Sequence, residues 1–398
     1  MAPPARRLAA AVVLALVLVL VARLAWPEPK VSPDAPLDPT VALRLTAWEE
    51  AAEVPLGVEG AWRLRDEEGV VLQEGYQLEG WLRADATGVQ VGPYLTGRDR
   101  VRIEPAGDLA LVVGDDRCPG VLDVGVVRDR DGPLGLTLVL ELPLEDYVVG
   151  VVSAELSSGA PGIAAALEAQ AVAARTWALW TLRRRGGPLR ADPRDQAFAG
   201  AQRWTTAARD AVRATRGQVL TWNGDLLPAF FHAWCGGGTA DAADMRFLDH
   251  DLPPLSGTAD PECRDAERAW VEVVSAERLD RLARRLALGD WLRSIHAVDR
   301  DPHGRVLRFR LVGSERHLEV SGEELRARLG LPSSLWLSAD LRPDGALVVR
   351  GRGRGHGIGL CQVGALRRAR AGWDRDAILA HDYPGAVVAP ASPAALRP

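Results

Sequence analysis

Short runs in which apolar and polar residues alternate fill the chain from Thr40 to about Val139. Four of them read VALRLTAW, GVVLQEG, VRIEP and LALVVG, and Gly, Asp and Pro separate them. Alternation with a period of two residues places apolar side chains on one face of a strand, and the separating residues favour turns. The pattern therefore predicts a β-rich region over about 40–139.

Helical spacing replaces this alternation after residue 156. Over 157–186 apolar residues fall on one stripe, Pro161 suits a first helical turn, and Gly186 follows three arginines at the predicted end. The same signals predict two shorter helices, over 201–216 and over 276–288.

Two hairpins and a strand–loop–helix unit complete the prediction. QVLTW-NG-DLLPAFFHAW contains Asn223-Gly224, a pair typical of two-residue hairpin turns. A second hairpin is predicted over 294–312, and strand ALVVRG leads through a glycine-rich loop into a helix over 359–371. We therefore expect an α+β fold, one interwoven body over 40–388 whose α+β part begins near residue 140, followed by a tail over 389–398.

The N-terminus has the layout of an export signal. Two arginines precede an unbroken apolar run, Leu8–Ala22, and Arg23 and Trp26 follow it. The run is long for a signal-peptide core and short for a spanning helix, but Arg23 can snorkel and Trp26 can lie at the membrane interface. We expect residues 1–26 to be a signal anchor, with a cleaved signal peptide as the alternative, and the proline-rich residues 27–39 to be a linker. Either interpretation places the body in the periplasm or cell envelope.

Charge and composition exclude two classes of function. The formal net charge of −5 argues against a nucleic-acid binder, which would carry a basic stripe. Lys30 is the only lysine of the chain, so a catalytic lysine and a phosphate-loop lysine in the body are excluded.

Glu155 lies where its surroundings predict no charge. The segment LPLEDYVVGVVSAEL at 142–156 is apolar around it. Burial disfavours the ionised form of a carboxyl, so a buried glutamate suits a general acid near neutral pH, as in sugar hydrolysis. The structural alternative is that Glu155 caps the following helix or pairs with an arginine such as Arg175.

A second candidate site is GRGRGHGIGLCQVGA at 351–365, where alternating glycines surround His356. Glycines permit positive φ and let the backbone approach a ligand, and the N–H groups of the following helix favour an anion. A nucleotide phosphate loop is not predicted, because the GK[ST] ending is missing. We expect His356 to contact a ligand, with a packed histidine as the alternative, and Gln362 to donate a hydrogen bond to a sugar.

Four cysteines, at 118, 235, 263 and 361, would face an oxidising compartment. His232 and Cys235, in FFHAWCGGG, have the HxxC spacing of metal ligands, and Cys263 follows. We prefer a Cys235–Cys263 disulfide, with a zinc ion held by His232, Cys235 and Cys263 as the alternative. The chain contains no HExxH and no GxSxG, so neither a zincin nor a serine-hydrolase mechanism is predicted.

Ordered blocks of the chain resemble the SpoIID/LytB family of bacterial cell-wall proteins. Within 142–179, LEDYVVGVVSAEL and ALEAQAVAARTWAL are similar to the family's LEDYLxGVVPxEM and ALKAQAVAARTYAL. GQVLTWNGDLLPAFFHAWCGGGTAD, VSGEELRARLGLPSS, the glycine–histidine loop and ILAHDYPGA follow in the family's order, so the resemblance spans about 40–388.

The chain also departs from the family's pattern. Ser153 stands where a proline is frequent, Leu156 replaces a methionine, Cys361 stands where serine is common, and Asp382 replaces the first tyrosine of the closing motif. Glu155, which matches the family's catalytic glutamate, is retained.

The resemblance implies a lytic transglycosylase that acts on peptidoglycan strands stripped of stem peptides. Glu155 would protonate the glycosidic oxygen and then accept the proton of the muramic acid 6-hydroxyl, which closes on C1 to give a 1,6-anhydro sugar. One carboxylate then suffices and no cofactor is required, in contrast to the two-carboxylate hydrolases. The candidate substrate-binding residues are His356, Gln362, Gln170 and Arg175. Independently of the resemblance, we infer that the N-terminus of the helix beyond His356 is a candidate receptor for the lactyl carboxylate.

Other functions stay open at this point. The family's other branch is described as enhancing a cell-wall amidase, so a non-enzymatic enhancer or peptidoglycan-binding module is the main alternative. A zinc-dependent hydrolase is a third, and a structural zinc is compatible with any of them. The expected partners are glycan strands, a cell-wall amidase and, through the N-terminal segment, the membrane.

The anchor hypothesis predicts the outcome of cell fractionation. Full-length protein should stay in the membrane fraction, with its body open to external protease, because no small-x-small cleavage site stands out beside Arg23. Recovery of a soluble form that begins near Trp26 or Pro27 would instead show a cleaved signal peptide.

Overall fold

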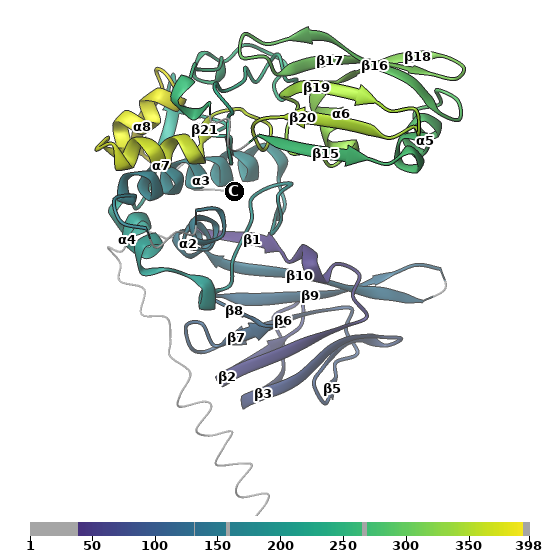
Figure 1. Cartoon of the computed structure of the whole chain (residues 1–398). Helices are drawn as coiled ribbons and strands as arrows, with labels where there is room; N and C mark the ends of the chain where they lie inside the picture. Colours follow the sequence, from purple (N-terminus) through teal and green to yellow (C-terminus); the bar gives the residue numbers. More distant parts are fainter. Residues whose placement is uncertain (1–38, 131, 157–159, 265–268, 393–398) are drawn as a thin grey trace, which may run out of the picture. The chain divides into compact units, whose positions relative to one another are not determined.

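A computed structural model describes residues 39–130, 132–156, 160–264 and 269–392 of the chain (Figure 1). These residues form seven α-helices and several β-sheets, so the predicted α+β class is confirmed. The chain divides into two compact units. The first unit contains the described residues up to 156 and Thr181–Arg216, and the second contains 160–180 and Gly217–Ala391. The boundary between the two units therefore differs from residue 140, where the sequence pattern changes from β-rich to mixed α+β.

The predicted anchor over 1–26 and nearly all of the predicted linker lie outside the described residues. Among the residues that are described, no helix combines the length and the apolar character needed to span a bilayer.

The first unit is built on one large, mostly antiparallel sheet, as the alternating runs predict. Its strand order is β11-β1-β10-β9-β6-β2-β3-β4-β5, and β7 pairs with both β2 and β8. Within β2, Val54, Leu56 and Val58 are buried while the residues between them are not, which is the period-two pattern of a half-buried sheet. The strands are β1 (Thr40–Arg44), β2 (Glu53–Arg65), β3 (Val71–Asp85), β4 (Gly88–Val91), β5 (Tyr94–Leu95), β6 (Arg100–Pro105), β7 (Leu111–Val113), β8 (Asp116–Cys118), β9 (Val121–Arg128), β10 (Pro133–Pro143) and β11 (Leu189–Arg190).

Helix α2 (Leu144–Glu155) occupies most of the apolar segment around Glu155. The sequence does not predict this helix, because α2 is buried on almost every side from Leu144 to Ser153 and so shows no polar face from which a helical period could be read. The acidic residues Glu145 and Asp146 lie in its first turn, where they complement the helix dipole. The helix predicted over 201–216 is also in this unit, but it is shorter: a 3₁₀ turn precedes α4 (Thr206–Ala214).

The second unit is organised around α3 (Ala164–Arg185), the long helix predicted over 157–186. Its residues up to Trp180 belong to this unit. Small side chains such as Ala166, Ala169 and Ala173 are fully buried there and pack in one core cluster with the glycine–histidine loop and the C-terminal helices. The short side chains allow close packing around the helix, which is why few long apolar residues are needed on it.

Both predicted hairpins are confirmed. Asn223 and Gly224 have φ values of 50° and 86°, the positive values that a type I′ turn needs, and join β12 to β13. The second hairpin is β16 with β17. A separate core cluster forms between these strands and the α5 and α6 helices. The elements are β12 (Gln218–Trp222), β13 (Asp225–Leu226), β14 (Phe231–His232), β15 (Trp270–Val274), α5 (Ala276–Arg285), β16 (Leu292–Arg300), β17 (Val306–Gly313), β18 (His317–Ser321), α6 (Gly322–Arg328), β19 (Trp336–Leu341), β20 (Leu347–Gly351), β21 (Leu360–Cys361), α7 (Gln362–Arg370), α8 (Arg375–Asp382) and β22 (Val387–Pro390).

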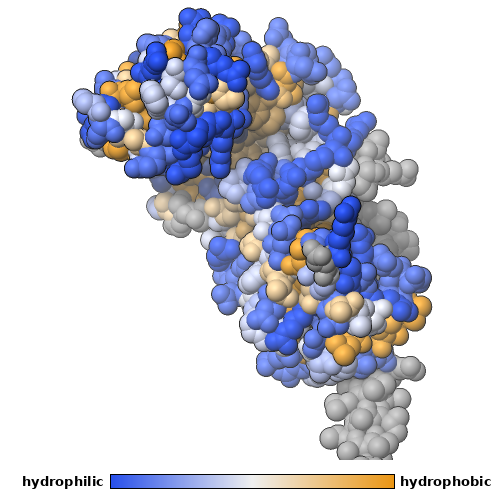
Figure 2. All heavy atoms as spheres, turned by 90° about the vertical axis from the view of Figure 1, so that its right-hand side faces the viewer, coloured by the Kyte–Doolittle hydropathy of each residue, from blue (hydrophilic) through white to orange (hydrophobic). Residues whose placement is uncertain are grey.

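The visible surface is mainly hydrophilic. Figure 2 shows one face, on which hydrophobic residues form only small patches among charged and polar ones. Some large apolar side chains are exposed, Tyr76, Trp81 and Val273 among them, which is ordinary for a folded protein.

Candidate functional site

Glu155 is the last residue of α2, at the point where that helix leaves the core of the first unit. The apolar segment predicted a buried glutamate, but Glu155 is only half-buried. Its Oε1 accepts a hydrogen bond from the backbone N–H of Ala197 at 3.1 Å. The carboxylate is thus held by a fixed backbone donor, on a residue that is not fully buried.

A loop segment, 195–199, lies along α2 and positions this carboxylate. The Tyr147 hydroxyl donates to Oε1 of Gln196 at 2.7 Å, and the rings of Tyr147 and Phe198 are stacked with centroids 6.0 Å apart. The N–H of Ala199 donates to the carbonyl of Gly150 at 3.2 Å. The sequence analysis missed this support, although the tyrosine of LEDY and the buried glutamine were available as signals.

His356 lies in the second unit, in a group of aromatic rings. The ring centroids of Phe230, Phe247 and His232 are 5.9, 5.2 and 5.7 Å from that of His356. Nδ1 of His356 accepts from the N–H of Ile358 at 3.1 Å, and the ring also hydrogen-bonds the backbone of Phe231. The packed-histidine alternative therefore has direct structural support, and ligand contact by His356 stays a prediction.

The environment of His356 keeps its ring neutral. Burial first, and then the charges of Arg326 and Arg305, lower the pKa of His356 from 6.5 to about 3. Burial likewise lowers the pKa of His232. At neutral pH the His356 ring is therefore a neutral group that packs and forms hydrogen bonds.

The glycines of the loop serve internal packing. A Cβ on Gly359 would lie 2.1 Å from the Phe230 carbonyl, and one on Gly357 would lie 2.4 Å from the Arg305 guanidinium. Both residues also have positive φ, 65° and 91°. The close approach that the sequence predicted is thus made by the protein's own chain.

The anion site expected at the N-terminus of the helix that follows the glycine–histidine loop, α7, is not formed as predicted. Helix α7 begins at Gln362, later than expected, and Cys361 caps it by accepting the N–H of Gly364 on Sγ at 3.3 Å. The N–H of Val363 donates to the carbonyl of Ala233 at 3.1 Å. Protein atoms therefore occupy two of the donors that a lactyl carboxylate would need.

Gln170 and Gln362 are brought together, but inside the second unit. Their side-chain amides lie 3.4 Å apart, and both residues are buried. Arg175 is fully buried as well, with Nη1 donating to the carbonyl of Gln218 at 3.0 Å. α3 is surrounded by core, so these side chains support the fold and present no surface to a polymer.

All four cysteines are free thiols, so the preferred Cys235–Cys263 disulfide is not formed. The candidate metal ligands also differ from the predicted set of His232, Cys235 and Cys263. Nδ1 of His232 faces the carbonyl of Ile358 at 3.1 Å, whereas Cys235 and Cys263 lie with Cys361 and Asp260. Sequence spacing could not find the last two, because they are close to Cys235 only in the folded chain.

A hollow of about 580 Å³ lies elsewhere on the first unit. Arg44, Arg100 and Arg102 line it together with Asp66 and Asp123, and Glu155 does not. Arg102 is already paired with Asp123 at 3.1 Å. Mixed, paired charges of this kind point to no single ligand.

Comparison with known proteins adds independent information. The sequence profile of the family described as SpoIID, Stage II sporulation protein, matches residues 134–222, which include α2, Glu155 and α3. An uncharacterised protein of Brachyspira hyodysenteriae (strain ATCC 49526 / WA1) is 30% identical over 257 residues, 63% of this chain and 67% of that protein.

Two relatives from Bacillus subtilis (strain 168) have names that indicate a role. The Stage II sporulation protein D is 26% identical over 276 residues, covering 64% of this chain and 76% of the relative. The protein named Amidase enhancer is 25% identical over 270 residues, 55% of this chain and 37% of the relative.

Substitution of Gly150 tests the support of Glu155. A glycine-to-alanine change inside a helix should stabilise it by about 0.5–1 kcal/mol, but the new Cβ would lie 2.3 Å from the Phe198 ring. Because overpacking costs about 1–3 kcal/mol, we expect Gly150→Ala to lower the unfolding midpoint in chemical denaturation. Ser153→Ala, on the same helix, adds no atoms and is the control. A rise in stability for Gly150→Ala would show that the 195–199 segment is not held against α2.

The low pKa of His356 predicts how stability depends on pH. Between about pH 6.5 and pH 3 the His356 ring is protonated in the unfolded chain but not in the folded chain. The free energy of unfolding therefore falls as the pH falls from 6.5 to 3. The slope is at most about 1.4 kcal/mol per pH unit for one histidine. His356→Asn should flatten the slope, since it keeps an acceptor for the Ile358 N–H but does not titrate. An unchanged slope, equal to that of the exposed control His296→Gln, would contradict the assigned burial.

Proposed function

Because this chain belongs to the SpoIID/LytB family, we propose that it is a peptidoglycan lytic transglycosylase in which Glu155 transfers the proton. The family and the relative named Amidase enhancer support a role at the cell wall. The observation that carries the finer proposal is the position of Glu155, a half-buried glutamate at the end of a buried helix, oriented by the Ala197 N–H.

The proposed reaction needs one carboxyl that acts twice. Glu155 first donates its proton to the glycosidic oxygen as the bond from that oxygen to C1 of the muramic acid breaks. The carboxylate then accepts the proton of the 6-hydroxyl as O6 forms a bond with C1. The product is a 1,6-anhydro sugar, no water is consumed, and the carboxyl returns to its starting state.

The arrangement at Glu155 suits these two steps. A proton-transfer group must reach the substrate, which a half-buried side chain at a helix end does. It must also keep one orientation, which the Ala197 N–H and the packed 195–199 segment provide. A second carboxylate is not needed, because the sugar's own hydroxyl is the nucleophile.

We place glycan contact in the second unit at its aromatic group, Trp180, Phe230, Phe247 and His356. Each of these residues is half-buried rather than fully enclosed. The Trp180 and Phe247 rings lie 6.1 and 5.5 Å from that of Phe230. Aromatic rings bury apolar area at low entropic cost, which suits the apolar faces of sugar rings.

The enhancer role is the second candidate, and the relative named Amidase enhancer favours it. In that case Glu155 and the aromatic group would bind the glycan without cleaving it. Either function requires the body to lie outside the cytoplasm, which we propose on the basis of the export-like N-terminus.

Glu155→Gln separates these functions. The substitution keeps size and most hydrogen bonds but cannot donate or accept the proton, so formation of anhydro products from denuded glycan strands should fall by about 10²–10⁴-fold, measured by mass spectrometry. Glycan affinity should change little. Glu168→Gln, a half-buried glutamate on α3, is the control and should retain wild-type turnover.

Three results are distinguishable. A wild type that cleaves and a Glu155→Gln protein that does not would support the transglycosylase. A wild type that binds glycan without cleaving it, yet accelerates an amidase, would support the enhancer. A Glu155→Gln protein that cleaves as well as the wild type would remove Glu155 from the mechanism.

A further inference from the structure

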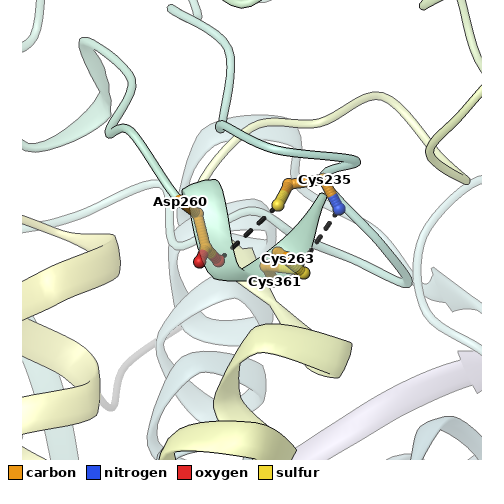
Figure 3. Close-up of side chains that lie close together, drawn as sticks. All are labelled: Cys235, Asp260, Cys263 and Cys361. Atoms are coloured by element: carbon orange, nitrogen blue, oxygen red, sulfur yellow. Dashed lines mark hydrogen bonds between the residues drawn. The ribbon is translucent and has the colours of Figure 1, made fainter. Parts of the chain in front are cut away.

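Three cysteines and one aspartate from separate segments of the second unit meet in its interior (Figure 3). Cys235 follows β14, Asp260 and Cys263 flank a short 3₁₀ turn, and Cys361 ends β21. In Figure 3 the four side chains point toward one another. Each cysteine is fully buried, and Asp260 is only 4% exposed.

The distances among these ligand atoms match a tetrahedral metal site. The Sγ atoms of Cys263 and Cys361 are 3.7 Å apart, and Sγ of Cys235 is 3.6 Å from Oδ2 of Asp260. All four ligand atoms lie within 4.8 Å of one another. Zn–S bonds of about 2.3 Å and a Zn–O bond of about 2.0 Å at tetrahedral angles put ligand atoms about 3.5–3.8 Å apart. Small adjustments would therefore close the set around one ion.

Hydrogen-bond donors of the protein surround the ligand atoms. The backbone N–H groups of Cys235 and Gly364 donate to Sγ of Cys361 at 3.2 and 3.3 Å. Arg368, itself buried, donates to Oδ2 of Asp260 at 2.7 Å. Partners of this kind fix the orientation of metal ligands and offset their charge.

A disulfide accounts for less of the cluster than a metal ion does. It would join two of the three thiols and leave the third thiol and the buried carboxylate unused. A four-coordinate ion uses all four groups and gives Asp260 a cation besides Arg368. Thiolates with one carboxylate in tetrahedral spacing favour zinc over calcium or magnesium, which prefer oxygen ligands.

We propose that Cys235, Asp260, Cys263 and Cys361 bind one structural zinc ion. With four protein ligands and no exposed ligand sulfur, the ion has no open position for water or substrate, so its role is to hold the fold. It ties the loop after β14 and the 260–263 turn to the start of α7. His232, the histidine of the HxxC motif, is not a ligand in this site. The proposal is independent of transglycosylase activity.

Metal analysis of the full-length chain tests it. Protein made with zinc should contain one zinc ion per chain, and replacement by cobalt(II) should give the visible bands of tetrahedral cobalt and strong thiolate-to-cobalt absorption. Removal of zinc with a chelator should lower the melting temperature and make the three cluster thiols reactive to alkylation, which peptide mapping would assign. None of these readouts depends on activity, so they separate failure of this proposal from failure of the proposed function.

Variants assign the ligands. Cys361→Ser and Asp260→Asn should each reduce the zinc content well below one per chain, while Cys118→Ser, a buried cysteine of the first unit, should retain it. Arg368→Lys keeps the charge but loses the planar donor pair, and should weaken zinc affinity by about 10–100-fold in competition with a chromophoric chelator.

Two results would overturn the proposal. One is wild-type protein without zinc that fails to show the cobalt spectrum and yields a Cys235–Cys263 or Cys263–Cys361 disulfide in non-reducing peptide maps. The other is a zinc content that is equal in Cys361→Ser and Cys118→Ser. If Cys361→Ser does not fold, the wild-type cobalt spectrum and the thiol protection pattern still decide the question.

Discussion

The chemistry of the second unit depends on one short parallel pairing, that of β14 with β21. Phe231 lies opposite Leu360, and His232 lies opposite Cys361. The N–H of Leu360 donates to the Phe230 carbonyl at 3.0 Å, which continues the pairing on the N-terminal side. Strand residues 129 positions apart in the chain are thereby locked in one register. This register assembles both groups, because members of the aromatic group and of the cysteine cluster lie on or next to these two strands.

Glycine makes this register possible. The backbone of the 351–359 loop passes so close to Phe230 and Arg305 that a Cβ at Gly359 or Gly357 would collide with them. In sequence, a glycine-rich loop centred on a histidine resembles a ligand-binding loop. Here the missing side chains allow the loop to pack closely against Phe230 and Arg305 of the same chain. We therefore place glycan contact at the half-buried aromatic residues beside His356 rather than at the loop backbone.

The two units carry different parts of the proposed chemistry. The first unit holds the proton-transfer group, since Glu155 is fixed by Ala197 and by the packed 195–199 segment. The second unit holds the aromatic group and the four-ligand cluster, which is closed on all sides by protein ligands. The proposed structural zinc site and the proposed catalytic carboxylate are thus separate, and their physical requirements differ: the zinc site must exclude water, whereas the carboxylate must be accessible to substrate.

The sequence alone determined the local features. Period-two runs marked the sheet, the stripe over 157–186 marked α3, and Asn223-Gly224 marked a turn, because each depends on neighbours a few residues away. Residue blocks also identified the family and Glu155. The tertiary structure decided the features that depend on contacts between distant residues: that Leu144–Glu155 is a helix, that Arg175 is buried, and that Cys361 lies beside Cys235. These outcomes depend on backbone pairing and on core packing around all sides of an element, and a local pattern records neither.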